Sequence, residues 1–212
     1  MLDEATKLRD ARVTCCEMLE DRGYNVDEIK SKVIGLPMDY FRELYNNNDI
    51  DLCVEHKTEK KNKMVVKFFV KGRKKLNESD LKKEADIISQ NLGKGNEYNG
   101  EPNIIMVSRE KPPSNVYNII NTEKYKNVEI FKINELLFNV THHDLTPKHS
   151  RMSIEEQKEV LEFYRAEKKD LPKISVNDPV AKYHGMKIGE ICKIERYSET
   201  TGFSNTYRHV RP

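Results

Sequence analysis

The stretch DPVAKYHGMKIGEICKIER, residues 178–196, is the most informative part of this chain. Asp178 is a favourable N-cap, and Pro179 suits the first helical position because its missing N–H would find no partner there. Gly185 is typical of the residue that follows the end of a helix. The pattern therefore predicts a short helix that begins after Asp178 and ends at Gly185.

Around this short helix the sequence predicts a small sheet and another helix. Five apolar or aromatic residues are assigned to the sheet, and residues 198–205 to the turn between two of its strands; the five are Ile188, Ile191, Ile194, Tyr207 and Val210. Upstream, Ser153 and Glu156 form a capping-box pattern ahead of a helix that carries Val160, Leu161 and Tyr164. Residues 141–212 are therefore predicted to form a small α+β domain.

Residues 1–140 show a longer pattern. A first helix is indicated by the spacing of Leu8, Ala11, Cys15 and Leu19, and Gly23 suits its end. Alternation from Ile50, followed by the β-rich run 64–70, predicts a hairpin. Further predicted elements are a helix over 78–92, a strand over 103–107, a helix capped by Ser114 and a strand over 128–133. Strands interleaved with helices predict a three-layer α/β/α domain with a mixed sheet. The chain is thus assigned to the α/β class, with a boundary near residues 140–147.

Composition excludes several classes of protein. The 212 residues include 37 lysines and arginines against 35 aspartates and glutamates, so any basic surface must be local. No apolar run approaches the ~20 residues that cross a bilayer. The first residues also lack the apolar region of a secretory signal. We therefore expect a soluble intracellular protein without membrane contact.

No metal or cofactor site is predicted. The four cysteines lack C-x-x-C spacing and are expected to be reduced packing residues; they are Cys15, Cys16, Cys53 and Cys192. Three histidines are interpreted as hydrogen-bonding residues near the domain boundary, because neighbouring histidines diverge and no acidic or thiol partner repeats at ligand spacing; they are His142, His143 and His149.

One enzymatic alternative depends on Asp39, Glu55 and Lys57. Their spacing is compatible with a P-D…(D/E)-x-K nuclease, in which carboxylates hold a divalent cation and a lysine positions the attacking water. Asp39 falls in a predicted helix over 37–45, however, whereas this chemistry needs an acid beside the strand. The nuclease is therefore the less favoured hypothesis.

Two segments are candidates for contact with DNA. Residues 57–75 carry nine basic residues against Glu59, which favours a phosphate backbone. Lysines on a hairpin also prevent edge-to-edge pairing, and this second interpretation is slightly favoured. The loop 109–114 joins a predicted strand to a predicted helix, so Arg109, Lys111 and the helix start at Ser114 could contact phosphates.

Several motifs, in a fixed order, resemble one protein family. They are the 178–196 stretch, the following Ser198, Thr200, Tyr207 and Arg208, HHDLTPKH at 142–149, LPKI at 171–174 and MLEDRGY at 18–24. Together they resemble the fifth-largest shared subunit of eukaryotic nuclear RNA polymerases. The archaeal member of this family consists of the second domain alone. The matches are dense at both ends of the chain and thin across residues 46–140.

The resemblance implies a non-catalytic subunit of a DNA-directed RNA polymerase. In that family the C-terminal assembly domain docks on the largest subunit, and the N-terminal jaw domain flanks downstream duplex DNA. The implied partner contacts are Asp178, Pro179, Tyr183, Arg196, Ser198, Thr200 and Tyr207. The implied DNA-proximal residues are Arg109, Lys111, Pro112 and Ser114, which would make weak, sequence-independent contacts. Transcription factors are further candidate partners.

Another alternative is a free-standing DNA-binding adaptor that carries the same second domain. The composition, rich in lysine, asparagine and isoleucine and without tryptophan, would suit an AT-rich eukaryote or a large DNA virus with its own polymerase. The expected location is the nucleus, or a viral factory or virion if the chain is virus-encoded.

Overall fold

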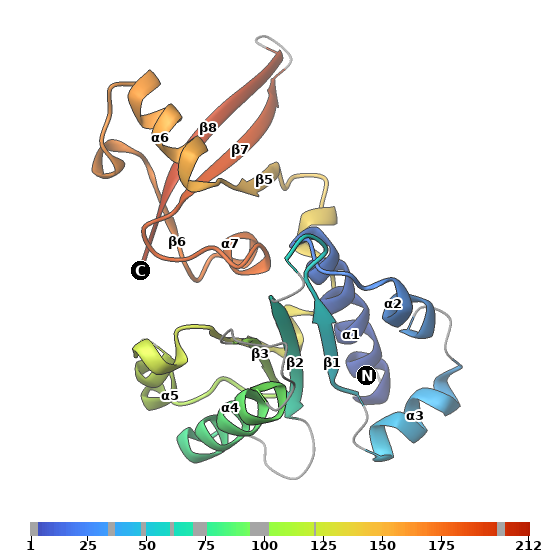
Figure 1. Ribbon diagram of the computed structural model, residues 1–212. Helices are drawn as coiled ribbons and strands as arrows, with labels where there is room; N and C mark the ends of the chain where they lie inside the picture. Colours follow the sequence, from blue (N-terminus) through green and yellow to red (C-terminus); the bar gives the residue numbers. More distant parts are fainter. Residues whose placement is uncertain are drawn as a thin grey trace. The chain divides into compact units, whose positions relative to one another are not determined.

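The computed structural model divides the chain into two compact units, Met1–Phe138 and Asn139–Pro212 (Figure 1). It describes residues 4–33, 37–47, 50–59, 62–69, 76–93, 102–120, 122–198 and 202–212. Each unit has its own four-stranded sheet and its own buried apolar cluster. The two units are therefore described separately.

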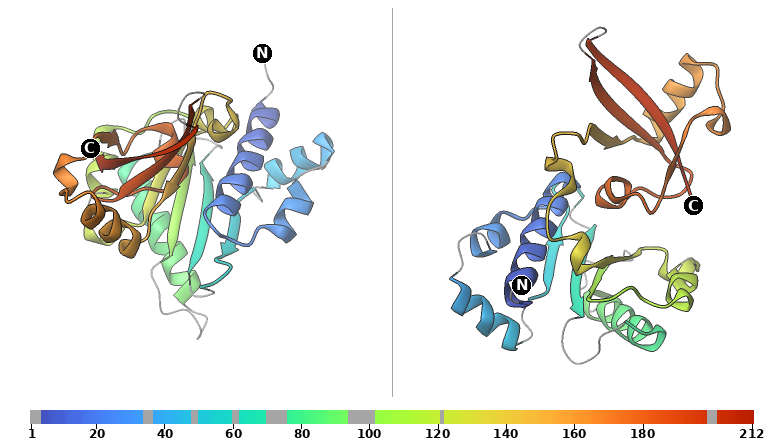
Figure 2. Two further views of the ribbon diagram at one scale, coloured as in Figure 1. Left: turned by 90° about the horizontal axis from the view of Figure 1, so that it is seen from above. Right: turned by 180° about the vertical axis from the view of Figure 1, so that it is seen from behind.

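The first unit is built on a mixed sheet in the order β1-β2-β3-β4. Strand β1 is antiparallel to β2, whereas β2, β3 and β4 run parallel. The elements are α1 (Glu4–Asp21), α2 (Asp27–Val33), α3 (Met38–Asn47), β1 (Leu52–Glu55), β2 (Lys63–Phe69), α4 (Glu78–Gly93), β3 (Asn103–Ser108), α5 (Ser114–Ile120), η1 (Glu123–Tyr125), β4 (Val128–Lys132) and η2 (Ile133–Glu135). Helices α4 and α5 lie on one face of the sheet and α1 on the other (Figure 2). The predicted α/β class, with helices on both faces of a mixed sheet, is confirmed.

Strand β3 supplies apolar side chains to both faces of this sheet. Ile104 and Met106 pack with buried side chains of α4 and α5. Ile105 and Val107 are also fully buried, and they point to the α1 face because successive side chains of a strand alternate. A parallel strand covered by helices on both faces is apolar throughout, which is the pattern that the sequence shows here.

The turn after α1 partly covers the outer edge of β1. The Asn25 N–H donates to the Glu55 carbonyl over 2.8 Å, and the Lys57 N–H donates to the Gly23 carbonyl over 2.9 Å. Gly23 has a φ of +88°, and a Cβ at this position would lie 2.9 Å from Nε2 of His56. The predicted helix-ending glycine is confirmed: its positive φ disfavours other residues, and a side chain there would have to displace the His56 ring.

The second unit contains a sheet in the order β5-β7-β8-β6. Its elements are η3 (Val140–His142), β5 (Lys148–Arg151), α6 (Ile154–Phe163), η4 (Lys168–Asp170), β6 (Lys173–Ser175), α7 (Pro179–Tyr183), β7 (Ile191–Ser198) and β8 (Gly202–Arg211). Strand β5 pairs with β7 only as far as Glu195, and β6 pairs only with the last residues of β8. The far end of the β7–β8 hairpin, residues 196–198 and 202–204, therefore extends beyond the other strands, and we call it the hairpin tip (Figure 1).

Both helix caps predicted in this unit are present. Asp178 Oδ1 accepts the N–H groups of Val180 (2.9 Å) and Ala181 (3.4 Å), with Pro179 at the start of α7. Ser153 and Glu156 form the predicted capping box of α6. The buried apolar cluster of the unit consists of Ile174, Ala181, Met186, Cys192, Ile194 and Val210.

Two strands were not predicted from the sequence, and one turn was predicted too long. Strand β5 has no fully buried residue and β6 has three residues, so neither gives a clear alternation. Ile188 was assigned to the sheet but lies in the turn before β7 and is 56% exposed. Residues 198–205 were assigned to a turn, but 198 lies in β7 and 202–205 lie in β8, where Phe203 is opposite Tyr197. Where these strands begin and end is decided by pairing with neighbouring strands, which the local sequence pattern does not reveal.

Three of the four cysteines are buried packing residues, as expected. Burial raises the pKa of Cys16 and that of Cys192 to about 11, so both thiols stay protonated at neutral pH. Cys53 differs from the expectation because its side chain is exposed on β1. Among the residues that the structure describes, no helix is long and apolar enough to cross a membrane.

Candidate partner interface and DNA-contact loop

The loop 109–113 follows β3 and leads into α5. The Ser108 hydroxyl donates to the Glu110 carbonyl over 2.8 Å, and Pro112 is buried, so the loop is held at both ends. Lys111 and Ser114 are exposed. The loop therefore presents its middle and the first residue of α5 to solvent.

The geometry argues against Arg109 as a phosphate ligand. Its Nη2 forms an ion pair with Glu4 of α1 and donates to the Tyr45 hydroxyl of α3 over 3.3 Å. A phosphate contact would have to break both interactions. Arg109 instead connects the end of β3 to two helices of its own unit.

Lys111 carries the uncompensated positive charge of this loop. Within the described residues it makes no ion pair or hydrogen bond, and its neighbour Glu110 is acidic. A single exposed lysine supports weak electrostatic contact with a phosphate and no sequence preference.

The described part of the basic hairpin contains three of its nine basic residues. Lys63 pairs with Glu55 over 2.8 Å, and Lys67 pairs with Asp51 over 2.6 Å. Lys57 is exposed. The other six, Lys60, Lys61, Lys71, Arg73, Lys74 and Lys75, lie outside the described residues. The two ion pairs show that Lys63 and Lys67 are compensated within the first unit. Strand β2 pairs with β1 on one side and β3 on the other, so the prediction that hairpin lysines protect a sheet edge is wrong for these two residues.

The three residues of the nuclease hypothesis do not form a site. Asp39 lies on α3, is 93% exposed and pairs with Arg42. Glu55 pairs with Lys63, and Lys57 follows the end of β1. Among the described residues no three acidic, histidine or cysteine side chains form a group that could hold a metal ion.

The three histidines near the unit boundary each make a local hydrogen bond. The His142 ring contacts Asn139 Nδ2 (3.3 Å), the His143 ring accepts the Leu145 N–H (3.2 Å), and the His149 ring donates to the Pro147 carbonyl (2.6 Å). These bonds agree with the structural interpretation of all three.

Several of the predicted partner residues instead build helix α7. Asp178 and Pro179 form its N-terminal end, as described above. Tyr183 is 3% exposed, and its hydroxyl accepts the Asn139 Nδ2–H over 2.9 Å. The prediction that Tyr183 contacts a partner does not fit this burial. Thr200 and the side chain of Ser198 lie outside the described part of the chain.

Arg196 and Tyr207 lie on opposite faces of the β7–β8 hairpin. Tyr207 is opposite Lys193, whereas Arg196 is opposite Ser204. Because residues 193 and 196 differ by an odd number, their side chains point to opposite faces. Arg196 shares its face with the buried Ile194, and Tyr207 lies on the α6 face with its ring centroid 5.9 Å from that of Tyr164. The two residues therefore cannot belong to one flat contact surface.

The α6 face carries an exposed aromatic surface that the sequence analysis did not identify. Tyr197 and Phe203 are 69% and 85% exposed and face each other with ring centroids 5.2 Å apart. Phe163 and Tyr164 at the end of α6 are 81% and 54% exposed. We call the five residues Phe163, Tyr164, Tyr197, Phe203 and Tyr207 the aromatic strip. Lys193, Glu195 and Tyr197 are two residues apart, so they lie on one face of β7, and this was the signal available in the sequence. The register that pairs Lys193 with Tyr207 comes only from the structure.

An aromatic strip of this kind is typical of a protein interface. Exposed aromatic groups that do not contribute to a core mark interaction sites, and tyrosine is common among the residues that dominate binding. A Lys193–Glu195 ion pair of 3.0 Å lies on the same face and supplies polar groups beside the rings. The geometry thus supports protein association by the second unit.

Comparison with known proteins matches both parts of the chain to one family. Residues 2–87 match "RNA polymerase Rpb5, N-terminal domain", and residues 138–210 match "RNA polymerase Rpb5, C-terminal domain". The chain is 32% identical over 211 residues to the DNA-directed RNA polymerases IV and V subunit 5B of Arabidopsis thaliana, covering 98% of this chain and 91% of that relative. It is 31% identical over 216 residues to the DNA-directed RNA polymerases I, II, and III subunit RPABC1 of Caenorhabditis briggsae, covering 98% and 97%. A similar relative is the Dictyostelium discoideum subunit rpabc1, 31% identical over 210 residues.

Proposed function

Since this chain belongs to the RNA polymerase Rpb5 family, we propose that it is a non-catalytic subunit of a multisubunit DNA-directed RNA polymerase. Its second unit docks on the largest subunit, and its first unit lies beside the downstream duplex. Catalysis belongs to the large subunits. The location is the nucleus, or a viral factory or virion if the chain is virus-encoded.

The observation that carries the docking proposal is the aromatic strip. Phe163 and Phe203 each expose more than four fifths of their surface, 81% and 85%. Exposure of such rings to water is unfavourable, because full burial of a large apolar side chain contributes roughly 1.5–3 kcal/mol of stabilising free energy. A large partner that covers them accounts for their exposure. Arg196, on the opposite face, is proposed as a peripheral contact only.

Co-purification is the direct test of the proposed function. We expect a tagged chain to recover the two largest polymerase subunits in near-equal amounts from cells that contain its natural polymerase, identified by mass spectrometry after a wash in moderate salt. A tagged chain that stops at residue 138 lacks the strip and serves as the control. Recovery of the full chain alone, without any polymerase subunit, would favour the free-standing adaptor and reject the proposal.

Contact with downstream DNA is proposed for Lys111, with Ser114 beside it. Replacing Lys111 by glutamate is expected to weaken the affinity of the complete polymerase for downstream duplex DNA roughly two- to fivefold at low salt, and to lower the slope of affinity against salt by about one. The measurement is a salt titration of fluorescent duplex binding. Lys83→Glu is a matched control, because Lys83 is an exposed lysine of α4 without a partner among the described residues.

Arg109 is expected to behave differently from Lys111. Replacing it by glutamine removes the Glu4 ion pair and weakens the Tyr45 contact, and should lower the free energy of unfolding by about 1 kcal/mol, because the pair is half-exposed and screened. Affinity for the duplex should stay unchanged. A loss of DNA affinity in Arg109→Gln equal to that in Lys111→Glu would contradict the assignment of the two roles.

A further inference from the structure

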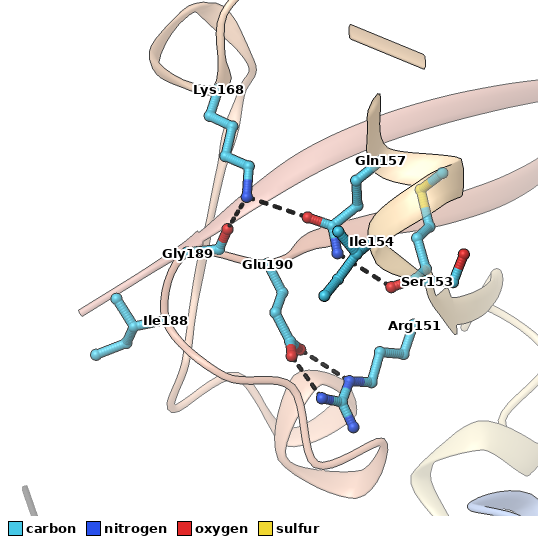
Figure 3. Close-up of a pocket in the computed structure, with 9 residues that line it drawn as sticks. Arg151, Ser153, Ile154, Gln157, Lys168, Ile188, Gly189 and Glu190 are labelled. Atoms are coloured by element: carbon cyan, nitrogen blue, oxygen red, sulfur yellow. Dashed lines mark hydrogen bonds and ion pairs between the residues drawn. The ribbon is translucent and has the colours of Figure 1, made fainter. Parts of the chain in front are cut away.

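A hollow of about 500 Å³ opens on the second unit, apart from the aromatic strip (Figure 3). It lies where β5 ends, α6 begins, η4 passes and the chain enters β7. Its polar groups come from Arg151, Gln157, Lys168 and Glu190, and its apolar rim from Ile154 and Ile188. We call it the α6 hollow.

The floor of the α6 hollow is a hydrogen-bonded network around Gln157, which is 6% exposed. Its Nε2–H donates to the Met152 carbonyl over 3.0 Å, and its Oε1 accepts from Lys168 Nζ over 3.1 Å. Lys168 Nζ also donates to the Gly189 carbonyl over 2.6 Å. An ammonium group has three N–H donors, so one donor of Lys168 remains without an acceptor among the described residues.

The α6 hollow carries a net positive charge. Arg151 is compensated, because its guanidinium forms a fork with Glu190 at 2.9 and 2.5 Å. Lys168 is half-buried and meets only the neutral oxygens of Gln157 and Gly189. The nearby His209 is consistent with this charge: burial lowers its pKa, and the positive charges of Arg211, Lys168 and Lys173 lower it further. A half-buried cation without an acidic partner favours a carboxylate supplied from outside.

Two exposed isoleucines flank the polar part of the hollow. Ile154 is 68% exposed and Ile188 is 56% exposed, and Figure 3 shows Ile154 near Gln157 and Ile188 apart from it, on the other side of Gly189. Neither belongs to the buried cluster of this unit. A molecule that fits this hollow should therefore offer a negative charge to Lys168 and apolar groups to the two isoleucines.

We propose that the α6 hollow binds a segment of the largest polymerase subunit in which an aspartate or glutamate is flanked by apolar side chains. The carboxylate meets Lys168, and the apolar neighbours cover Ile154 and Ile188. The inference rests on the proposed docking of this unit on the largest subunit. Ile154 begins the helix whose last residue is Phe163 of the aromatic strip, so the hollow and the strip lie at the two ends of α6.

Subunit exchange in the assembled polymerase tests the role of the charge. Lys168→Met keeps the apolar stem and removes the ammonium group, and we expect the variant to dissociate about tenfold faster when challenged with excess unlabelled wild-type chain. Lys169→Met is the matched control, because Lys169 is adjacent, 67% exposed and paired with Glu167. It should exchange within twofold of the wild type. Lys168→Arg retains the charge and should recover most of the lost residence time.

Site-specific cross-linking identifies the occupant and remains informative if Lys168→Met is unstable. A photo-reactive amino acid at position 188 is expected to cross-link to a segment of the largest subunit that contains the acidic and apolar residues described. Equal exchange rates for Lys168→Met and Lys169→Met would overturn the proposal. So would cross-links from position 188 to another subunit, to a segment without carboxylates, or to no protein.

A second cross-linker at position 203 separates this inference from the docking proposal. Cross-links to the largest subunit from position 203 but not from position 188 reject the α6 hollow and leave the aromatic strip in place. Absence of polymerase subunits around the wild-type chain rejects the docking proposal itself.

Discussion

The double substitution Tyr197→Ser and Phe203→Ser is expected to release the chain from the polymerase. The two rings are exposed and face each other across the hairpin tip, which extends past α6 in Figure 1. Aromatic residues that dominate an interface contribute about 2 kcal/mol or more each, so removing both should weaken association by at least about a hundredfold. The measurement is the fraction of polymerase recovered with the tagged variant, together with its rate of exchange against wild-type chain.

The same substitution should leave the unit folded. Exposed positions usually change the free energy of unfolding by at most about 0.5 kcal/mol, and the loss of one cross-strand ring pair adds at most about 1 kcal/mol. Leu145→Ser is a suitable control, because Leu145 is an apolar residue of the same unit, 85% exposed and outside the strip. Normal recovery of polymerase by the double variant would show that the aromatic strip is not the docking surface.

Arg196→Glu decides which face of the hairpin makes the contact. Arg196 is exposed on the face opposite the strip, so charge reversal there should reduce recovery far less than the loss of Tyr197 and Phe203. If Arg196→Glu reduces polymerase recovery more than the double substitution does, the docking surface lies on the Arg196 face of the hairpin.

The elements with strong local signals were predictable from the sequence. Asp178 and Pro179 specify the start of α7 because a carboxylate oxygen can accept the first free N–H groups and proline lacks the N–H that would be left over. The apolar residues of β3 specify a buried strand in the same direct way. Strand β6 was not predictable, because three residues carry too little alternation and their place is set by pairing with β8.

The roles of individual side chains were less predictable than the fold. Arg109 looked like an exposed loop cation, and only the three-dimensional structure brings it to Glu4, which is distant in the sequence. Tyr183 looked like a partner contact because it lies in the most informative motif. In the structure its ring is buried, and its hydroxyl bonds to Asn139 from the beginning of the unit. A resemblance to family motifs shows which residues are important. It does not show whether such a residue packs inside its own unit or contacts a partner.

Replacing Tyr183 by alanine is expected to have the largest effect on stability. The ring is 3% exposed, and truncation would leave a cavity and deprive Asn139 Nδ2 of its 2.9 Å bond. Removing a buried aromatic side chain lowers the free energy of unfolding by about 3–5 kcal/mol. That is a large part of the about 5–15 kcal/mol that holds a typical domain folded. Hydrogen exchange should accelerate at the buried amides of β7, such as Ile194, and stay unchanged at Ile105 in the first unit.

Tyr183→Phe separates internal packing from partner contact. It keeps the ring and removes only the hydroxyl, so the loss should be about 1 kcal/mol, from one hydrogen bond, because Asn139 Nδ2 keeps its contact with the His142 ring. Because Tyr183 is buried in its own unit, this variant should recover polymerase as well as the wild type does. Reduced recovery with unchanged hydrogen exchange at Ile194 would show that the Tyr183 hydroxyl contacts the partner, and would restore the assignment made from the sequence motif.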